Sequence, residues 1–126
     1  MNASPFGNRD VAAVLARIAD LLDILGEDPR RARAYRRAAQ AVENEPRPLA
    51  QLQADGALQT IPGVGPALAE RIGEILASGR CALLDELEAR VPASVLELLN
   101  VPGIGPRTVH VLYTQLGICT ADELEA

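Results

Sequence analysis

The hexapeptide IPGVGP at residues 61–66 returns forty positions later as VPGIGP at residues 101–106. Each copy follows a stretch of helical pattern, at residues 49–58 and 93–100, and precedes another, at residues 67–77 and 107–116. The closing proline of each hexapeptide suits the first position of a helix, where its missing N–H costs nothing. The repeat therefore predicts two copies of a unit made of a helix, a glycine hairpin and a second helix.

The segment before the first hexapeptide also has a helical pattern. Apolar residues between positions 11 and 25 recur every three or four residues, which predicts a helix with Asn8 as its cap and Gly26 at its end. Asp28 and Pro29 are a typical start for a second helix, which we expect to reach Glu43.

No stretch alternates polar and apolar residues over the length of a strand. The fold class predicted is therefore all-α, a small helical bundle that contains both hairpins. We expect two parts, an N-terminal helical domain with the first hairpin at residues 1–80 and a subdomain with the second hairpin at residues 81–126.

The composition limits the environment of the chain. Apolar residues make up 48% of its 126 residues, enough for a small core, but their longest run is far too short to span a membrane. The first nine residues lack the apolar segment of a signal peptide. Cys81 and Cys119 are too few for a disulfide framework or a zinc site, so we expect a reduced, cytoplasmic setting with no required cofactor.

The charge is unevenly distributed. The net charge is -5, all twelve basic residues are arginine, and five of these lie between Arg30 and Arg37. A polyanion would therefore be attracted only locally. This cluster is either a solvated helix face paired with Glu27 and Asp28 or a phosphate-binding surface, and we favour the second. Three aromatic residues in the whole chain argue against binding of single strands by base stacking.

The glycine hairpins predict an anion site. Two glycines two positions apart permit a positive φ and let the turn present its N–H groups beside the start of a helix. Free N–H groups and the helix dipole favour an anion there, and a DNA phosphate would be bound without reading the bases. A plain turn is the alternative for a single copy, but the duplication favours phosphate binding. The predicted contacts are the amides of Gly63, Val64, Gly65, Gly103, Ile104 and Gly105, with Arg107 beside the second turn.

Together with DPRRARAYRRAA at residues 28–39, the two hexapeptides resemble the N-terminal region of family X DNA polymerases, especially the bacterial type. The resemblance extends from about residue 9 to residue 126. It implies a fold like the N-terminal part of polymerase beta, and binding of gapped or nicked duplex DNA in base excision repair. It also implies a sodium or potassium ion at each hairpin. The carbonyls concerned would be those of Gln59, Ile61 and Val64, and of Leu99, Val101 and Ile104.

Several members of that family remove a 5′-deoxyribose phosphate through a lysine Schiff base. Arg71 occupies the matching position, and arginine cannot form an imine because it stays protonated. Gln59, Ala67 and Leu83 match other lysines of the family, and this chain has none. We therefore expect no lyase activity, and nothing resembles the polymerase catalytic domain. The remaining 5′-phosphate pocket would consist of Arg30, Arg31, Tyr35 and Arg71.

Two other functions remain open. The acidic net charge is compatible with a protein-interaction module, and a lyase is the least favoured reading. We expect the chain to be a monomer. His110, the single histidine, is expected at a half-exposed helix position, with a phosphate contact as the alternative.

Overall fold

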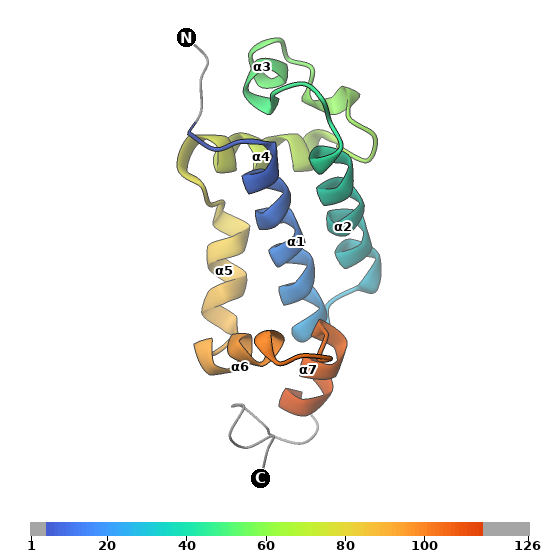
Figure 1. The fold of residues 1–126 in the computed structure, drawn as a ribbon, viewed down its shortest axis with the longest axis vertical. Helices are drawn as coiled ribbons and strands as arrows, with labels where there is room; N and C mark the ends of the chain where they lie inside the picture. The colour runs from blue at the N-terminus through green and yellow to red at the C-terminus, as the bar shows by residue number, and fades with distance from the viewer. Residues whose placement is uncertain (1–4, 115–126) are drawn as a thin grey trace.

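The computed structural model describes residues 5–114 (Figure 1). Within this range the chain is helical and forms no strand, which confirms the all-α prediction. The α-helices are α1 (Asn8–Ile24), α2 (Pro29–Glu43), α3 (Leu49–Ala54), α4 (Pro66–Ser78), α5 (Ala82–Arg90), α6 (Ala93–Glu97) and α7 (Pro106–Thr114), with 3₁₀ turns at Leu58–Thr60 and Leu98–Asn100. No helix described between residues 5 and 114 has both the length and the apolar character needed to cross a membrane.

Helix α1 is the centre of the bundle. It lies antiparallel to α2 and also contacts α4, α5 and α7 (Figure 1). Its apolar face is buried as the three-and-four spacing predicted, with Leu15, Ile18 and Leu22 fully inaccessible. Side chains from both hairpin units, such as Ile72 and Leu98, join the same core. Figure 1 shows the two hairpin units at opposite ends of the α1–α2 pair.

The start of α2 follows the prediction. Pro29 is its first residue, and the Asp28 carboxylate accepts a hydrogen bond from the backbone N–H of Arg30 at 2.9 Å. This contact satisfies one of the free amides in the first turn of the helix.

The predicted cap of α1 is wrong. Gly7 occupies the cap position, and its N–H donates to the Asp10 carboxylate at 2.9 Å. The Asn8 side chain instead holds the segment between α2 and α3. Its Nδ2 donates to the carbonyls of Glu45 at 3.1 Å and Arg47 at 2.8 Å, and its Oδ1 accepts from the Leu49 N–H at 2.9 Å.

The helix predicted over residues 49–58 is interrupted. Helix α3 ends at Ala54, and Gly56 takes a left-handed conformation with φ +66°. The N–H groups of Gly56 and Ala57 return to the carbonyls of Gln53 and Leu52, a pattern that closes a helix. The last helix begins at Pro106 and is described to Thr114, so the end predicted at residue 116 lies outside the described residues.

Candidate nucleic-acid interface

The two glycine turns have the same backbone geometry. Gly63 and Gly103 have φ of +86° and +84°, in the left-handed region that favours glycine. The turns are closed by hydrogen bonds from the Val64 N–H to the Ile61 carbonyl at 3.0 Å and from the Ile104 N–H to the Val101 carbonyl at 3.1 Å. The repeat in sequence is therefore also a repeat in backbone structure.

These closing bonds change the predicted set of phosphate donors. The amides of Val64 and Ile104 already donate inside their own turns, so they are not free for an anion. Within residues 5–114, no hydrogen-bond acceptor is in range of the amides of Gly63, Gly65, Gly103 and Gly105. The first helical bond of α4 is made by Ala69, to the Gly65 carbonyl at 2.9 Å, so the amides of Ala67 and Leu68 are also free at this helix start.

Both turns are open to a ligand. A Cβ added at Gly65, Gly103 or Gly105 would meet no atom within 4 Å. At Gly63 the nearest atom would be Cγ of Arg37, at 3.9 Å. The inner side of the first turn is filled by Ile61 and Val64, both buried. The turn therefore shows its backbone to solvent on one side and is supported by the core on the other.

The predicted cation sites depend on backbone oxygens. Among the described residues, no group of His, Cys, Asp or Glu side chains could hold a metal ion. The carbonyls of Ile61 and Val101 each accept one hydrogen bond, which leaves each a second lone pair. Carbonyl oxygens are hard donors of the kind that alkali and alkaline-earth cations prefer, so this donor set fits the ion chemically.

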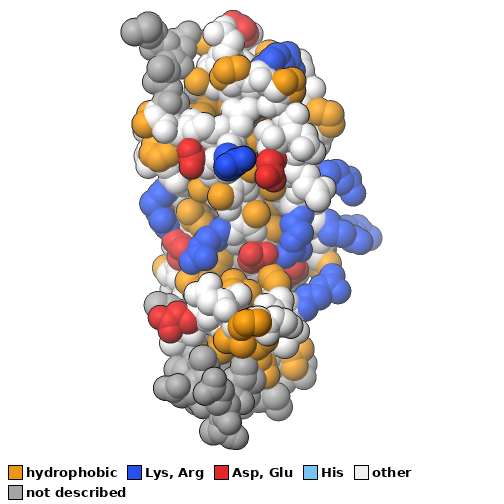
Figure 2. Space-filling view, viewed as in Figure 1, with side chains coloured by type: hydrophobic (Ala, Val, Ile, Leu, Met, Phe, Trp, Pro, Cys, Tyr) orange, Lys and Arg blue, Asp and Glu red, His pale blue; other side chains and the backbone are white. Residues whose placement is uncertain are grey.

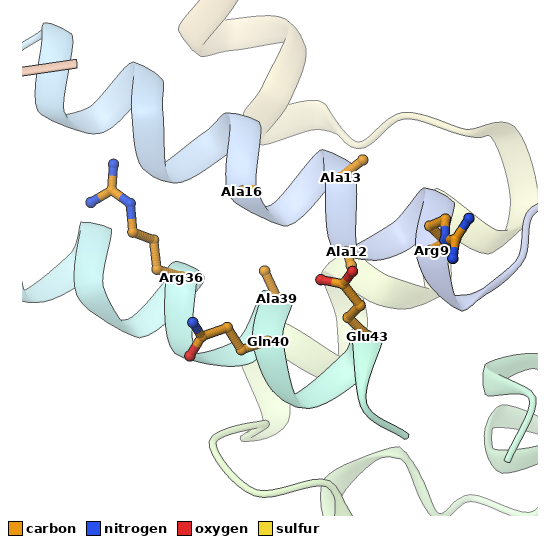
Figure 3. Close-up of a pocket in the computed structure, with 8 residues that line it drawn as sticks. All are labelled: Arg9, Ala12, Ala13, Ala16, Arg36, Ala39, Gln40 and Glu43. Atoms are coloured by element: carbon orange, nitrogen blue, oxygen red, sulfur yellow. The ribbon is translucent and has the colours of Figure 1, made fainter. Parts of the chain in front are cut away.

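Unlike the rest of the arginine cluster, Arg36 reaches across to acidic side chains of α1. Its guanidinium pairs with Asp20 at 2.9 Å and with Asp23 at 2.7 Å, and the Asp23 side chain is only 7% exposed. Burial alone would lower the pKa of Arg36, but hydrogen bonds to the two carboxylates outweigh it and raise that pKa above its usual value. Figure 3 shows Arg36 reaching from α2 toward α1 at one end of a groove that is lined largely by alanines.

The other arginines of the cluster keep their charge exposed. Glu27 pairs with Arg90 at 3.1 Å and Asp28 caps α2, so the pairing considered as an alternative for the cluster does not occur. No ion pair is found between any described carboxylate and four of the five side chains. Figure 2 shows arginine side chains projecting from the edge of the molecule that α2 forms. The four arginines of the cluster without a described carboxylate partner are Arg30, Arg31, Arg33 and Arg37.

The predicted 5′-phosphate pocket is only partly assembled. The Tyr35 side chain is buried and lies near Arg71. Burial alone would lower the pKa of Arg71, but its interactions with Tyr35 and with nearby acidic groups raise that pKa above its usual value. Arg71 also lies 3.5 Å from Glu74, a carboxylate that the prediction did not include. Arg31 is one helical turn before Tyr35, whereas Arg30 lines a separate hollow with Arg33, Ala34 and Arg37.

The second hairpin has its own neighbours. Arg107 is exposed in the first turn of α7, and no carboxylate of the described chain pairs with it. His110 is half-buried, as expected, and its ring nitrogen Nδ1 contacts the Ile24 carbonyl. The position of Arg37 beside Gly63 was not predicted. Residue spacing within α2 carries no signal for a contact between Arg37 and a turn far along the chain.

Comparison with known proteins supports this geometry. Residues 6–81 match the family model described as a helix-hairpin-helix domain, and residues 95–126 match that of a SAM-like helix-hairpin-helix tandem. Thus both glycine turns fall within segments that such models recognise.

Relatives of known function match over most of this chain. It is 29% identical over 117 residues to a DNA polymerase/3′-5′ exonuclease PolX of Bacillus subtilis, covering 93% of this chain and 20% of that protein. It is 29% identical to DNA polymerase lambda of Arabidopsis thaliana (94% of this chain, 22% of the relative) and 38% identical to DNA polymerase lambda of Rattus norvegicus (70% and 15%). The chain thus spans about a fifth or less of each relative's length.

The turns, the helices that flank them and these matches agree on one classification. The chain belongs to the helix-hairpin-helix domain family and is homologous to the N-terminal part of the family X DNA polymerases.

Proposed function

We propose that this chain binds DNA without sequence preference, through sugar-phosphate contacts at its two glycine hairpins, as the N-terminal portion or a stand-alone relative of a family X repair polymerase. The observation that carries the proposal is the pair of open turns, each with glycine amides free of internal partners at the start of a helix. Such amides and the helix dipole favour a phosphate and carry no information about the bases. The relatives, named as DNA polymerases, support a nucleic-acid ligand.

The contacts proposed are those that the geometry leaves available. In the first hairpin they are the amides of Gly63 and Gly65, joined by the free amides of the first turn of α4. In the second they are the amides of Gly103 and Gly105, with Arg107 beside them. The backbone carbonyls of each turn would hold a sodium or potassium ion, whose charge would add to the attraction for phosphate.

Salt dependence tests the proposal directly. Fluorescence anisotropy would be measured with intact, nicked and gapped duplexes, the last with and without a 5′-phosphate, in a salt series. If the hairpins and a few arginines contact phosphates, the logarithm of the affinity should fall with the logarithm of salt with a slope of roughly -2 to -5. Binding with no slope, or no binding to any of these DNAs at low salt, would contradict the proposal.

The preference for gapped or nicked DNA and the monomeric state belong to the proposal as well. Tyr35 and Arg71 form the part of the 5′-phosphate pocket that supports a gap preference. A tighter affinity for the 5′-phosphorylated gap than for the plain gap would support it. Sedimentation of the free chain would test the monomer, and fractionation of cells the cytoplasmic location.

We further propose that this chain binds a 5′ end without cleaving it. Arg71 stands where a Schiff-base lysine would be needed, and a guanidinium stays protonated at physiological pH, so it cannot form the imine. Borohydride trapping on abasic DNA should give no covalent adduct. An adduct would show a nucleophilic amine that this proposal excludes. If this chain instead docks a protein through an acidic helix, replacing Gly63 and Gly103 with bulky residues would leave partner binding intact, whereas under the present proposal the same change abolishes DNA binding.

A further inference from the structure

We propose that three arginines on one face of α2, Arg30, Arg33 and Arg37, form a track that continues the phosphate-binding surface of the first hairpin along the same DNA strand. This α2 arginine track rests on the proposed function and extends it. The track is a contact surface distinct from the turn amides and from the pocket around Tyr35.

The track begins at the hairpin itself. The aliphatic stem of Arg37 runs beside Gly63, since Cγ and Cδ would lie 3.9 Å and 4.0 Å from a Cβ at that glycine. Gly63 carries one of the free amides of the turn. A phosphate bound at the turn would therefore have the Arg37 guanidinium as a neighbour, and the next phosphate of the strand would be drawn along α2.

The track has the length of a short run of phosphates. Its three side chains and Ala34 line a shallow hollow of about 290 Å³. Arg30 and Arg37 are seven residues apart on the helix, or about 10 Å along its axis. One strand of B-DNA carries a phosphate about every 3.4 Å of its axis, so the track matches about two or three phosphates. One small anion would satisfy only part of it.

The charges of the track are uncompensated. Within the described part of the chain, Arg17, Arg36, Arg47, Arg71, Arg80 and Arg90 each pair with a carboxylate. The three arginines of the track have no such partner there. Three like charges around one hollow repel each other, and a polyanion relieves that repulsion. The planar guanidinium also suits phosphate, which it can bind through two hydrogen bonds.

A charge-matched pair of variants tests the track. The first carries Arg30→Gln, Arg33→Gln and Arg37→Gln, and the control carries three substitutions that remove the same charge elsewhere. The control positions are Arg9, Arg80 and Arg90, each changed to Gln. Arg80 and Arg90 form exposed ion pairs, so we expect their loss to cost only a little stability. Thermal melting would check that both variants remain folded.

The readout is the slope of affinity against salt on duplex DNA. Each lost phosphate contact removes about 0.9 from the size of the slope, so the track variant should lose about 2 to 3 and the control less than about 1. Equal losses in the two variants, or no loss in the track variant, would overturn the track. If the unsubstituted chain does not bind DNA, the proposed function fails instead.

A second measurement separates a track from a site for one anion. Inorganic phosphate would be added as a competitor at constant ionic strength. We expect it to displace little DNA, because no single phosphate spans the three arginines. Displacement by inorganic phosphate that is lost in the track variant would show a site for one small anion and overturn the proposal of a strand-length track.

Discussion

His110 Nδ1 lies 2.7 Å from the carbonyl oxygen of Ile24, at the end of α1. A carbonyl only accepts hydrogen bonds, so the ring donates from Nδ1 and satisfies one of the free carbonyls of the helix end. The ring also covers Gly26, where a Cβ would lie 2.7 Å from Cε1 of the imidazole. This contact attaches the second hairpin's helix to the central helix of the bundle.

Replacing Gly26 with Ala should therefore destabilise the fold for two reasons, a φ of +72° and the overlap with His110. We expect a loss of about 1–3 kcal/mol in the free energy of unfolding. In a chain that already carries His110→Ala, the overlap is gone and the same change should cost less, by about 0.5 kcal/mol or more. Urea unfolding of the unsubstituted chain, the two single variants and the double variant measures this coupling. If the losses in the free energy of unfolding simply add, the contact is contradicted.

A negative charge introduced at position 65 should weaken DNA binding at the first hairpin. Its backbone is extended, and an added side chain meets open space, so Gly65→Asp and Gly65→Asn should both fold. Both residues are good helix caps. The Asp carboxylate would take the place of the phosphate and repel DNA, whereas the neutral Asn serves as the control of matched shape. Anisotropy should show much weaker binding for Asp than for Asn, and equal affinities would argue against a phosphate at this helix start.

The two glycines of the first turn should differ in their tolerance of a methyl group. Gly63→Ala places a side chain at φ +86° and should cost about 1–2 kcal/mol, or about 4–8 °C in melting temperature. Gly65→Ala places it in extended backbone and should cost about 0.5 kcal/mol. Thermal melts measure both. A larger loss at Gly65 than at Gly63 would mean that the turn has a different backbone conformation.

Arg36 should matter for stability and little for DNA binding. Arg36→Gln leaves the Asp23 carboxylate buried without its partner and should destabilise the fold by about 1–2 kcal/mol. The loss is limited because the arginine side chain is 40% exposed. Arg37→Gln is the comparison, with the opposite pattern of near-native stability and weaker DNA binding. DNA affinity would be measured well below the melting temperature of both variants. A larger loss of affinity in Arg36→Gln than in Arg37→Gln would refute this division.

Acid should weaken the contact between α1 and α5 through Glu88. Burial alone would raise the pKa of this carboxyl, but hydrogen bonds from Arg80 and Arg17 lower it below the usual 4.5. A group whose pKa is lower in the folded state stabilises the fold above its unfolded pKa and loses that effect as the pH falls through the folded value. The melting temperature should therefore fall more steeply below about pH 4.5 than in the Glu88→Gln variant. Parallel curves for the two chains would contradict this role.

Local features were predictable from the sequence, and long-range ones were not. The hairpins, the buried face of α1 and the cap at Asp28 each depend on residues a few positions apart, so spacing alone indicated them. Asn8 binds backbone groups 37 to 41 residues away, and no local pattern indicates such partners. A local signal also favoured the wrong role, because an asparagine before an apolar run is a typical helix cap.

The candidate site shows the same limit. The glycine turns were predicted as anion sites, but which amides remain free depends on the closing bonds to Ile61 and Val101. The arginine cluster was visible in the sequence. Its division into Arg36, held by the acidic groups of α1, and the exposed arginines depends on how two helices pack.

The position of α1 has a consequence for anyone who wishes to shorten this chain. Helix α1 contacts α2 and α4, which come before Gly79 in the chain, and also α5 and α7, which come after it. A fragment cut after Gly79 would leave a strip of leucine and isoleucine on α1 uncovered and prone to self-association. Dissection into separate hairpin fragments would therefore need polar replacements along that strip.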